Sequence, residues 1–415
     1  MEIPRDRYLE RLKRMKFKGG VKIITGMRRS GKSYLLFKIY RRYLLSEGVQ
    51  EDHIISVALD LLKNEHLRDV HKLDHEIRSR IKDDGQYYVM IDEIQLADGF
   101  VDLINGFRAD SRLDVYITGS NSKFLSSDIV TEFRGRGTEI RVQPLSFSEY
   151  LPVSGLDERA AWKRYLTFGG LPEGIGLEDE DRMNYLSSLI STVYVRDIVE
   201  RKGIQYPDVL NKIFDMLSSA IGSLTNPYRM QCSIRTKGLD VGWNTVSEYV
   251  GHLEDAFLFE ESKRFDIRGK DYIDTPSKYY STDLGIRNAK LGFRQDEYTL
   301  LMENAIYNEL RYRGFAVDVG VIGIREYIDG KKRYKQLEID FVANKGDRRY
   351  YIQSAYHMDD DIKKEQEIRP FLKLNDGFRK LVITGDDVPC HVNSMGITVM
   401  NVIDFMKNPF SLEMI

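Results

Sequence analysis

Short apolar runs alternate with longer amphipathic stretches over the first third of the chain. The apolar runs have strand length, and the stretches between them repeat their apolar positions at helical spacing. This alternation predicts an α/β fold in which a parallel sheet is covered by helices on both faces. The expected strands are Lys22–Thr25, Ile54–Leu59, Tyr87–Ile91, Val115–Thr118 and a further candidate at Glu139–Val142, and the expected helices are Ser33–Leu45, Lys72–Ile81 and Gly99–Arg108.

After Pro144 the pattern becomes mainly helical. A sharp break at Phe168-Gly-Gly-Leu-Pro172 and a long amphipathic run from Arg182 to Arg201 predict a helical lid. Residues further on combine helices with a candidate hairpin and then return to mixed helix and strand. The expected parts are therefore a core at 1–145, a lid at 146–205, a middle segment at 206–285 and a C-terminal domain at 286–415.

The first predicted helix, residues 5–18, is strongly basic. Tyr8, Leu12 and Met15 fall on one face, and seven of its fourteen residues are Lys or Arg. A charge run on a helix is usually a solvated face, so packing through the apolar side is favoured over a nucleic-acid-binding arm.

Composition narrows the class of protein. The residues are 42% apolar and 30% charged, which is typical of globular domains, and the net charge of −2 indicates neither a nucleic-acid nor a membrane partner. Cys232 and Cys390 lie far apart, so neither a disulfide framework nor a zinc site is indicated. Sparing cysteine use, a polar start and the absence of a run of ~20 apolar residues favour a cytoplasmic location.

A phosphate-binding loop follows the first predicted strand. The stretch from Gly26 to Ser33 has the required glycines and ends in Lys32-Ser33, where the next helix opens. Glycines let backbone N–H groups surround a phosphate, Lys32 would neutralise the β- and γ-phosphates, and Ser33 would place its hydroxyl on Mg²⁺. A plain glycine turn gives no reason for Lys32-Ser33. The residues expected to bind ATP are Gly26, Met27, Arg28, Arg29, Ser30, Gly31, Lys32, Ser33 and Tyr34.

Polar residues end the third and fourth predicted strands. Asp92 and Glu93 follow one strand, where Asp92 can hold Mg²⁺ and Glu93 can polarise the attacking water. In a parallel sheet, Ser120 and Asn121 reach the same edge, where either could orient water and the γ-phosphate. These pairs predict hydrolysis, while a surface carboxylate pair and a polar loop are the plainer alternatives.

Two arginines follow on a glycine-rich turn. Arg134 and Arg136 could each stabilise charge that develops on the γ-phosphate, in the same chain or in a neighbouring one. An ordinary loop arginine accounts for them equally well.

These motifs resemble those of AAA+ ATP-binding proteins of bacteria and archaea that carry a C-terminal domain of unknown function. The resemblance implies a P-loop AAA+ sheet with a helical lid, a winged-helix-like segment, and a degenerate C-terminal domain similar to the restriction-endonuclease fold. The matching stretches are Thr25–Ser33, Ile91–Gln95, Thr118–Ser122, Arg134–Arg136, Gln143–Phe147, Phe168–Pro172, Val195–Ile198, Tyr280–Gly285, Glu303–Asn304 and Glu338–Phe341.

The middle segment contains a candidate helix-turn-helix at residues 233–255. Its second helix, from Trp243 to Asp255, contains no Lys or Arg and carries three acids. Phosphate neutralisation dominates affinity for DNA, so this helix favours packing or assembly over DNA reading.

The C-terminal domain has candidate metal-binding acids without a complete set of partners. Glu303 is expected on a helix and Asp340 at the end of a strand. Nucleases of the similar fold follow with a strand bearing acid-x-lysine, but the tripeptide here is Gln353-Ser-Ala355. Metal-dependent cleavage is therefore not expected.

The favoured function is an ATPase that couples Mg²⁺-ATP binding and hydrolysis to rearrangement of its C-terminal domains. The alternatives are a nucleic-acid-binding or nuclease-like module regulated by ATP, and a P-loop kinase, for which Glu93 beside Asp92 would be unnecessary. The sequence leaves open whether the chain forms a homo-oligomer or binds nucleic acid, and it indicates no membrane partner.

Overall fold

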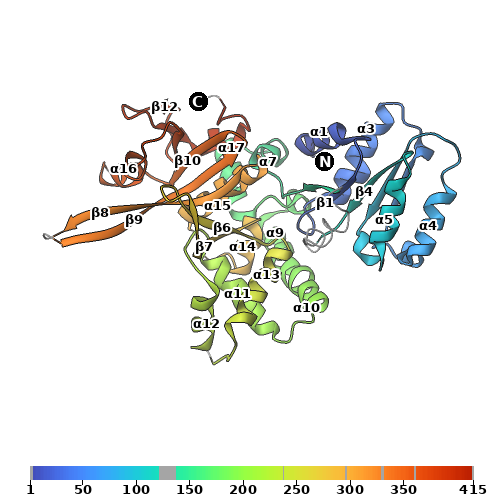
Figure 1. Ribbon diagram of the computed structural model, residues 1–415, viewed down its shortest axis with the longest axis horizontal. Coiled ribbons are helices and arrows are strands. Elements are labelled where there is room, and N and C mark those ends of the chain that lie inside the picture. The colour runs from blue at the N-terminus through green and yellow to red at the C-terminus, as the bar shows by residue number, and fades with distance from the viewer. Residues whose placement is uncertain are drawn as a thin grey trace. The chain divides into compact units, whose positions relative to one another are not determined.

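A computed structural model describes residues 3–120, 137–236, 238–294, 297–328, 331–358 and 361–413. The chain divides into two compact units, one formed by residues 1–144 with 255–257 and the other by residues 145–254 with 258–415 (Figure 1). Among the described residues, no helix is both long and apolar enough to cross a membrane.

The first unit is a five-stranded parallel sheet with strand order β2-β3-β4-β1-β5. All five expected strands are confirmed, and the three expected helices are present with ends shifted by a few residues. The strands are β1 (Val21–Thr25), β2 (Ile54–Ala58), β3 (Tyr87–Asp92), β4 (Leu113–Thr118) and β5 (Gly137–Arg141). The helices are α1 (Asp6–Met15), α2 (Lys32–Tyr34) continuing through a π-helical stretch (Leu35–Tyr40) into α3 (Arg41–Ser46), α4 (Val70–Ser79) and α5 (Phe100–Ala109).

Alternate strand residues divide this sheet into two buried faces. Odd-numbered positions such as Val89 and Val115 pack against Leu73 and Ile77 of α4 and against α5. On the other face, the Tyr116 ring lies 5.0 Å from that of Tyr40 in the helix that follows β1. Helices on both faces explain why these strands are apolar almost throughout.

Helix α1 packs through its apolar side, as its pattern predicts. Tyr8 and Leu12 are buried, while Met15 is only half-buried. The Tyr8 hydroxyl accepts a hydrogen bond from the Gln143 backbone N–H at 3.1 Å. Arg7, Arg11 and Arg14 are exposed, whereas Arg5, directly before the helix, is buried.

The second unit joins a helical part to a mixed eight-stranded sheet of order β12-β13-β11-β10-β9-β8-β6-β7. Strands β6 and β7, which precede residue 286, belong to the same sheet as the strands that follow it. The winged-helix-like and restriction-endonuclease-like assignments stay predictions.

The helices of the second unit are α7 (Phe147–Ser154), α8 (Glu158–Phe168), α9 (Asp179–Leu189) with a π-helical stretch (Ile190–Val195) into α10 (Arg196–Lys202), α11 (Pro207–Ser219), α12 (Pro227–Arg235), α13 (Trp243–Asp255), α14 (Leu284–Lys290), α15 (Tyr298–Tyr312), α16 (Asp361–Ile368) and α17 (Val402–Lys407). Its strands are β6 (Phe259–Asp266), β7 (Asp271–Ser281), β8 (Ala316–Ile328), β9 (Lys331–Lys345), β10 (Arg348–Ala355), β11 (Arg379–Thr384), β12 (His391–Val392) and β13 (Thr398–Asn401). The expected helix Trp243–Asp255 is thus confirmed.

Candidate functional site

The loop after β1 has the backbone shape of a phosphate cradle. Gly26, Arg29 and Gly31 all have positive φ, at 135°, 64° and 95°. A Cβ at Gly26 would overlap the carbonyl oxygen of Val142, so only glycine fits there. The helix begins immediately afterwards at Lys32, which leaves its first backbone N–H groups directed at the loop.

The positive charge of Lys32 lies inside this loop. Its side chain is buried, and Nζ donates to the carbonyl oxygens of Gly26 and Met27, both at 2.9 Å. A fixed ammonium next to a helix N-terminus favours an anion with several negative oxygens. The loop therefore fits a polyphosphate.

The remaining residues expected to bind ATP surround this charge with differing exposure. Met27 and Ser30 are buried within the loop, whereas Arg28 is half-buried and Arg29 exposed. Tyr34, in the first helical turn, is 38% exposed. Ser33, which follows Lys32, is also exposed.

Asp92 ends β3 as a buried carboxylate beside the loop. The Thr118 hydroxyl, at the end of neighbouring β4, donates to Asp92 Oδ1, and the Ser33 hydroxyl also bonds Asp92. Burial raises the pKa of Asp92 above its usual range, and these two hydrogen bonds partly oppose the rise. Ser33 and Asp92 thus bring together the hydroxyl and carboxylate oxygens that Mg²⁺ prefers.

Glu93 is held by one of its two carboxylate oxygens. Its backbone is left-handed (φ 51°), and its N–H donates to Thr118 Oγ1 at 3.1 Å. Ser120 Oγ donates to Glu93 Oε2 at 3.1 Å, and Gln95 Nε2 donates to the same oxygen. Within the described part of the chain no residue donates a hydrogen bond to Oε1, so this oxygen of a fixed carboxylate stays open to a ligand.

Sequence reasoning found the two carboxylates but missed two residues that orient them. Thr118 contacts Asp92 and the Glu93 backbone, and Gln95 contacts the Glu93 side chain. A threonine ending an apolar strand beside the acidic one was the available signal for Thr118. Ser120 lies at the site as expected, whereas Asn121, Arg134 and Arg136 lie outside the described residues.

A second polar cluster lies in the C-terminal sheet. Lys278 Nζ of β7 is 3.0 Å from Glu303 Oε1, 2.9 Å from Glu338 Oε1 and 3.4 Å from Asp340 Oδ1. Tyr280 also donates to Glu303, at 2.8 Å. The structure therefore brings Glu303 and Asp340 together, as the sequence suggested, but with a lysine ammonium between them.

The charged groups of this cluster shift one another's pKa values. Burial raises the pKa of Glu303 to about 7, although Lys278 opposes the rise. Burial alone would lower the pKa of Lys278, but Glu303, Asp340 and Glu338 raise it overall, so the ammonium form is strongly favoured. Lys278 therefore supplies the positive charge that balances these carboxylates.

Asp340 and Gln353 lie side by side in the C-terminal sheet. Asp340 lies within the long strand β9, so the expectation that it ends a strand was wrong; β9 is lengthened by its pairing with β8. Gln353 stands where an acid would be needed, and its amide is already occupied. It accepts from the Asp340 N–H at 2.8 Å and donates to Glu367 at 2.9 Å.

Comparison with known proteins identifies the family. Residues 18–151 match the family described as an AAA domain, and residues 159–297 match one described as a domain of unknown function, DUF8612. An uncharacterized protein of Haemophilus influenzae is 31% identical over 410 residues, which cover 97% of this chain and 98% of that protein. The chain belongs to the same family as this Haemophilus influenzae protein, and its N-terminal part is an AAA domain.

One further relative of this AAA-domain protein has no described role, and one solved structure shares its fold. An uncharacterized protein of Methanocaldococcus jannaschii is 27% identical over 390 residues, 88% of this chain and 82% of that protein. The Walker-type ATPase PABY2304 of Pyrococcus abyssi superposes with a TM-score of 0.50 at 15% identity, covering 70% of this chain and 96% of that chain. An AAA domain implies ATP binding, and the loop geometry fits it.

Proposed function

We propose that this chain hydrolyses ATP, with Glu93 as the residue that polarises the attacking water. The observation that supports it best is the asymmetric fixing of the Glu93 carboxylate, in which Ser120 and Gln95 both donate to Oε2. A general base needs one oxygen free to accept a proton and a side chain that does not swing away. The arrangement of Oε1 and Oε2 meets both needs.

The other residues hold the nucleotide. Lys32 exchanges its two loop carbonyls for phosphate oxygens, Ser33 and Asp92 hold Mg²⁺, and the N–H groups of the loop surround the β-phosphate. Mg²⁺ neutralises phosphate charge when bound. Arg134 and Arg136 stay candidates for stabilising the transition state.

Two substitutions separate binding from hydrolysis. Glu93→Gln keeps the shape and reach of the side chain but removes its basicity, so turnover should fall by roughly 10² to 10⁴ while ATP stays bound. Lys32→Ala removes the fixed cation and should nearly abolish ATP binding. Steady-state phosphate release and equilibrium binding of a fluorescent ATP analogue measure the two effects.

Matched controls exist on the same unit. Glu65→Gln and Lys63→Ala change exposed side chains of the same types outside the loop, and both should leave turnover and affinity unchanged. If Glu93→Gln hydrolyses ATP at the parental rate, the proposal of a hydrolytic enzyme fails. If Lys32→Ala retains affinity, the assignment of the loop fails.

We further propose that the nucleotide state changes the arrangement of the C-terminal parts, or the assembly of several copies. The Glu93→Gln variant offers a stable ATP complex for this test. Hydrogen exchange by mass spectrometry with and without ATP should show changed protection in residues 146–413. Measuring the molecular size of the same two samples distinguishes a nucleotide-dependent homo-oligomer from a monomeric switch. Identical hydrogen exchange in both samples would refute the proposed effect of the nucleotide on the C-terminal parts.

A further inference from the structure

Strands β8 and β9 continue beyond the rest of the C-terminal sheet as a two-stranded ribbon. Pairing of β8 with β6 ends at Val321, and pairing of β9 with β10 ends at Phe341. From Gly323↔Gln336 outward, six residue pairs join β8 only to β9. At ~3.4 Å per residue this two-stranded part is about 20 Å long, and its base packs through Ile324 against the C-terminal core. Figure 1 shows it projecting from the sheet.

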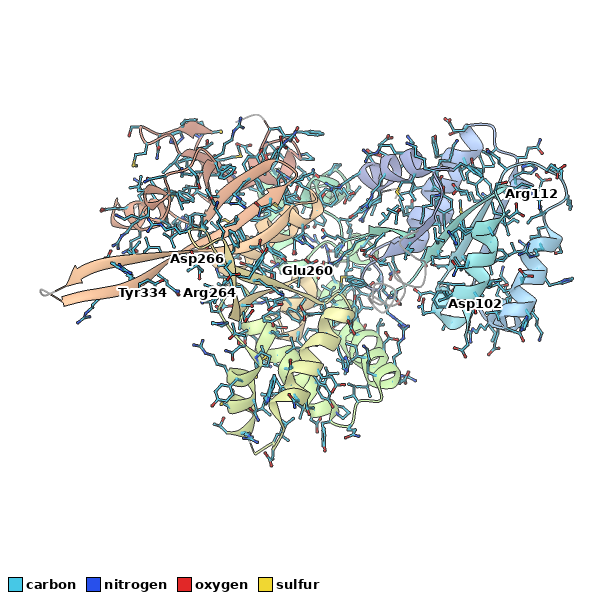
Figure 2. The ribbon with its side chains drawn as sticks, in the orientation of Figure 1. Asp102, Arg112, Glu260, Arg264, Asp266 and Tyr334 are labelled. Carbon is cyan, nitrogen blue, oxygen red and sulfur yellow. The ribbon has the colours of Figure 1, made fainter. Side chains whose placement is uncertain are left out.

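The ribbon is stiffened at its base. Arg268 donates to the Gly323 carbonyl at 3.1 Å, and Arg264 donates to Gln336 Oε1 at 2.7 Å. The ring of Tyr334 lies over Gly323, where a Cβ would meet its hydroxyl. Figure 2 shows Tyr334 on the ribbon and Arg264 nearer the body of the sheet. An isolated hairpin is only marginally stable, so these contacts help to hold it extended.

The charge of the ribbon is mostly of one sign. Residues 323–336 contain five basic and two acidic residues, a net charge of +3 in a chain whose net charge is −2. The side chains of Arg325, Arg333 and Lys335 are exposed and form no ion pair with any described residue. Of the acids, Glu326 pairs with Arg369.

We propose that this ribbon docks into the major groove of duplex DNA. Two strands lie about 4.8 Å apart, and the major groove of B-DNA, about 12 Å wide, admits a two-stranded β-ribbon. The exposed basic side chains on both faces of the ribbon meet the phosphates that line such a groove. Tyr334, 66% exposed, adds a flat polar-tipped surface for sugar and base edges.

Protection of a free sheet edge is the simpler role for exposed basic residues. Charge of either sign, a proline or a short strand serves that purpose. The ribbon instead is long and carries positive charge on both faces, since Arg325 and Tyr334 pair on one face while Arg333 and Lys335 alternate with them on the other. A net positive charge on a projecting element indicates an anionic partner of extended shape.

Salt dependence of DNA binding tests the proposal directly. The full chain is titrated into fluorescein-labelled duplexes of DNA and of RNA, each about two helical turns long, and anisotropy is read between about 50 and 200 mM salt. The ribbon variant is R325S/R333S/K335S, and the matched control R159S/K163S/R235S removes three exposed positive charges from helices. A third variant, Tyr334→Ala, removes the aromatic surface without changing charge.

The parent chain and the control should bind duplex DNA alike, whereas the ribbon variant should bind at least about tenfold more weakly at the lowest salt. Its slope of log affinity against log salt should be shallower by up to about 3, since each lost phosphate contact removes about 0.9. Tyr334→Ala should weaken binding with an unchanged slope, and R325K/R333K should retain the slope.

Three results would overturn the proposal: no binding by the parent at the lowest salt, equal loss in the ribbon variant and the control, or equal binding of the two duplexes. Duplex RNA has a deep, narrow major groove that does not admit a ribbon, so equal binding would exclude groove docking. Unfolding followed by the fluorescence of Trp162 and Trp243, which both lie in the same unit as the ribbon, confirms that every variant is folded.

Discussion

Replacement of Thr118 by valine tests whether the two carboxylates of the ATP site depend on one buried hydroxyl. Thr118 is fully buried, and its Oγ1 donates to Asp92 Oδ1 while accepting the Glu93 N–H at 3.1 Å. Valine has nearly the same shape but can make neither hydrogen bond. The substitution therefore removes the hydroxyl and leaves the packing nearly unchanged.

The size of the effect follows from these two contacts. A hydrogen bond to a charged group contributes about 1.5–3 kcal/mol, and a buried N–H left without an acceptor costs about 1–3 kcal/mol. Because both involve the same atom, the two are not additive, and we expect a loss of about 3 kcal/mol in local stability. Loss of the Thr118 bond also lets the pKa of Asp92 rise further, which weakens Mg²⁺ binding.

Two assays measure the effect of Thr118→Val. Hydrogen exchange of the β3 and β4 amides should become faster, and turnover should fall at least about tenfold, with more Mg²⁺ needed for half-maximal rate. Thr138→Val, at an exposed position of β5 in the same sheet, is the control and should change neither. Parental exchange rates together with parental Mg²⁺ dependence would refute the role given to Thr118.

The remaining predictions concern the C-terminal cluster and the arginines. Lys278→Met should destabilise the second unit by about 3–5 kcal/mol, because it leaves buried carboxylates without their counter-charge. Urea unfolding followed by tryptophan fluorescence measures this loss of stability. A loss below about 1 kcal/mol would contradict the reasoning. Glu303 has a folded-state pKa of about 7, above its unfolded value. Its contribution to the free energy of unfolding is therefore present below about pH 4.5 and is lost as the pH rises through 7. Glu303→Gln should flatten this decline, and an unchanged pH profile would count against it. Purified protein should not cleave DNA or RNA with Mg²⁺, and cleavage that disappears on Asp340→Ala would disprove this. Replacing Arg134 or Arg136 by alanine should lower turnover on the order of 10³-fold if the residue is an arginine finger, and should lower ATP affinity far less. Parental turnover in both variants would show that the two arginines are ordinary loop residues.

Local patterns were enough to predict the first unit. Strands buried on both faces are continuous apolar runs, and a plain glycine turn does not account for a loop that ends in Lys32-Ser33. Asp92 and Glu93 could be placed beside that loop because the carboxyl ends of parallel strands meet at one edge of the sheet. The five strands and the position of this pair could therefore be predicted from the sequence alone.

The partners of those residues depended on tertiary structure. Thr118 lies 26 positions from Asp92, and Lys278 lies 25 positions from Glu303 and 62 from Asp340. No period or local spacing joins residues so far apart, since strand order and register decide which side chains meet. A lysine between two carboxylates was invisible in the sequence for this reason.

The sequence by itself determined the nucleotide loop, its acidic pair and the alternation of strands and helices, because each depends on neighbours within a few residues. Only the tertiary structure decided that β6 and β7 join the C-terminal sheet, and that β8 and β9 extend past their neighbours. The basic residues of the ribbon resemble an ordinary solvated run when read along the chain. Where the pairing with β6 and β10 stops, the same residues become a projecting, positively charged surface.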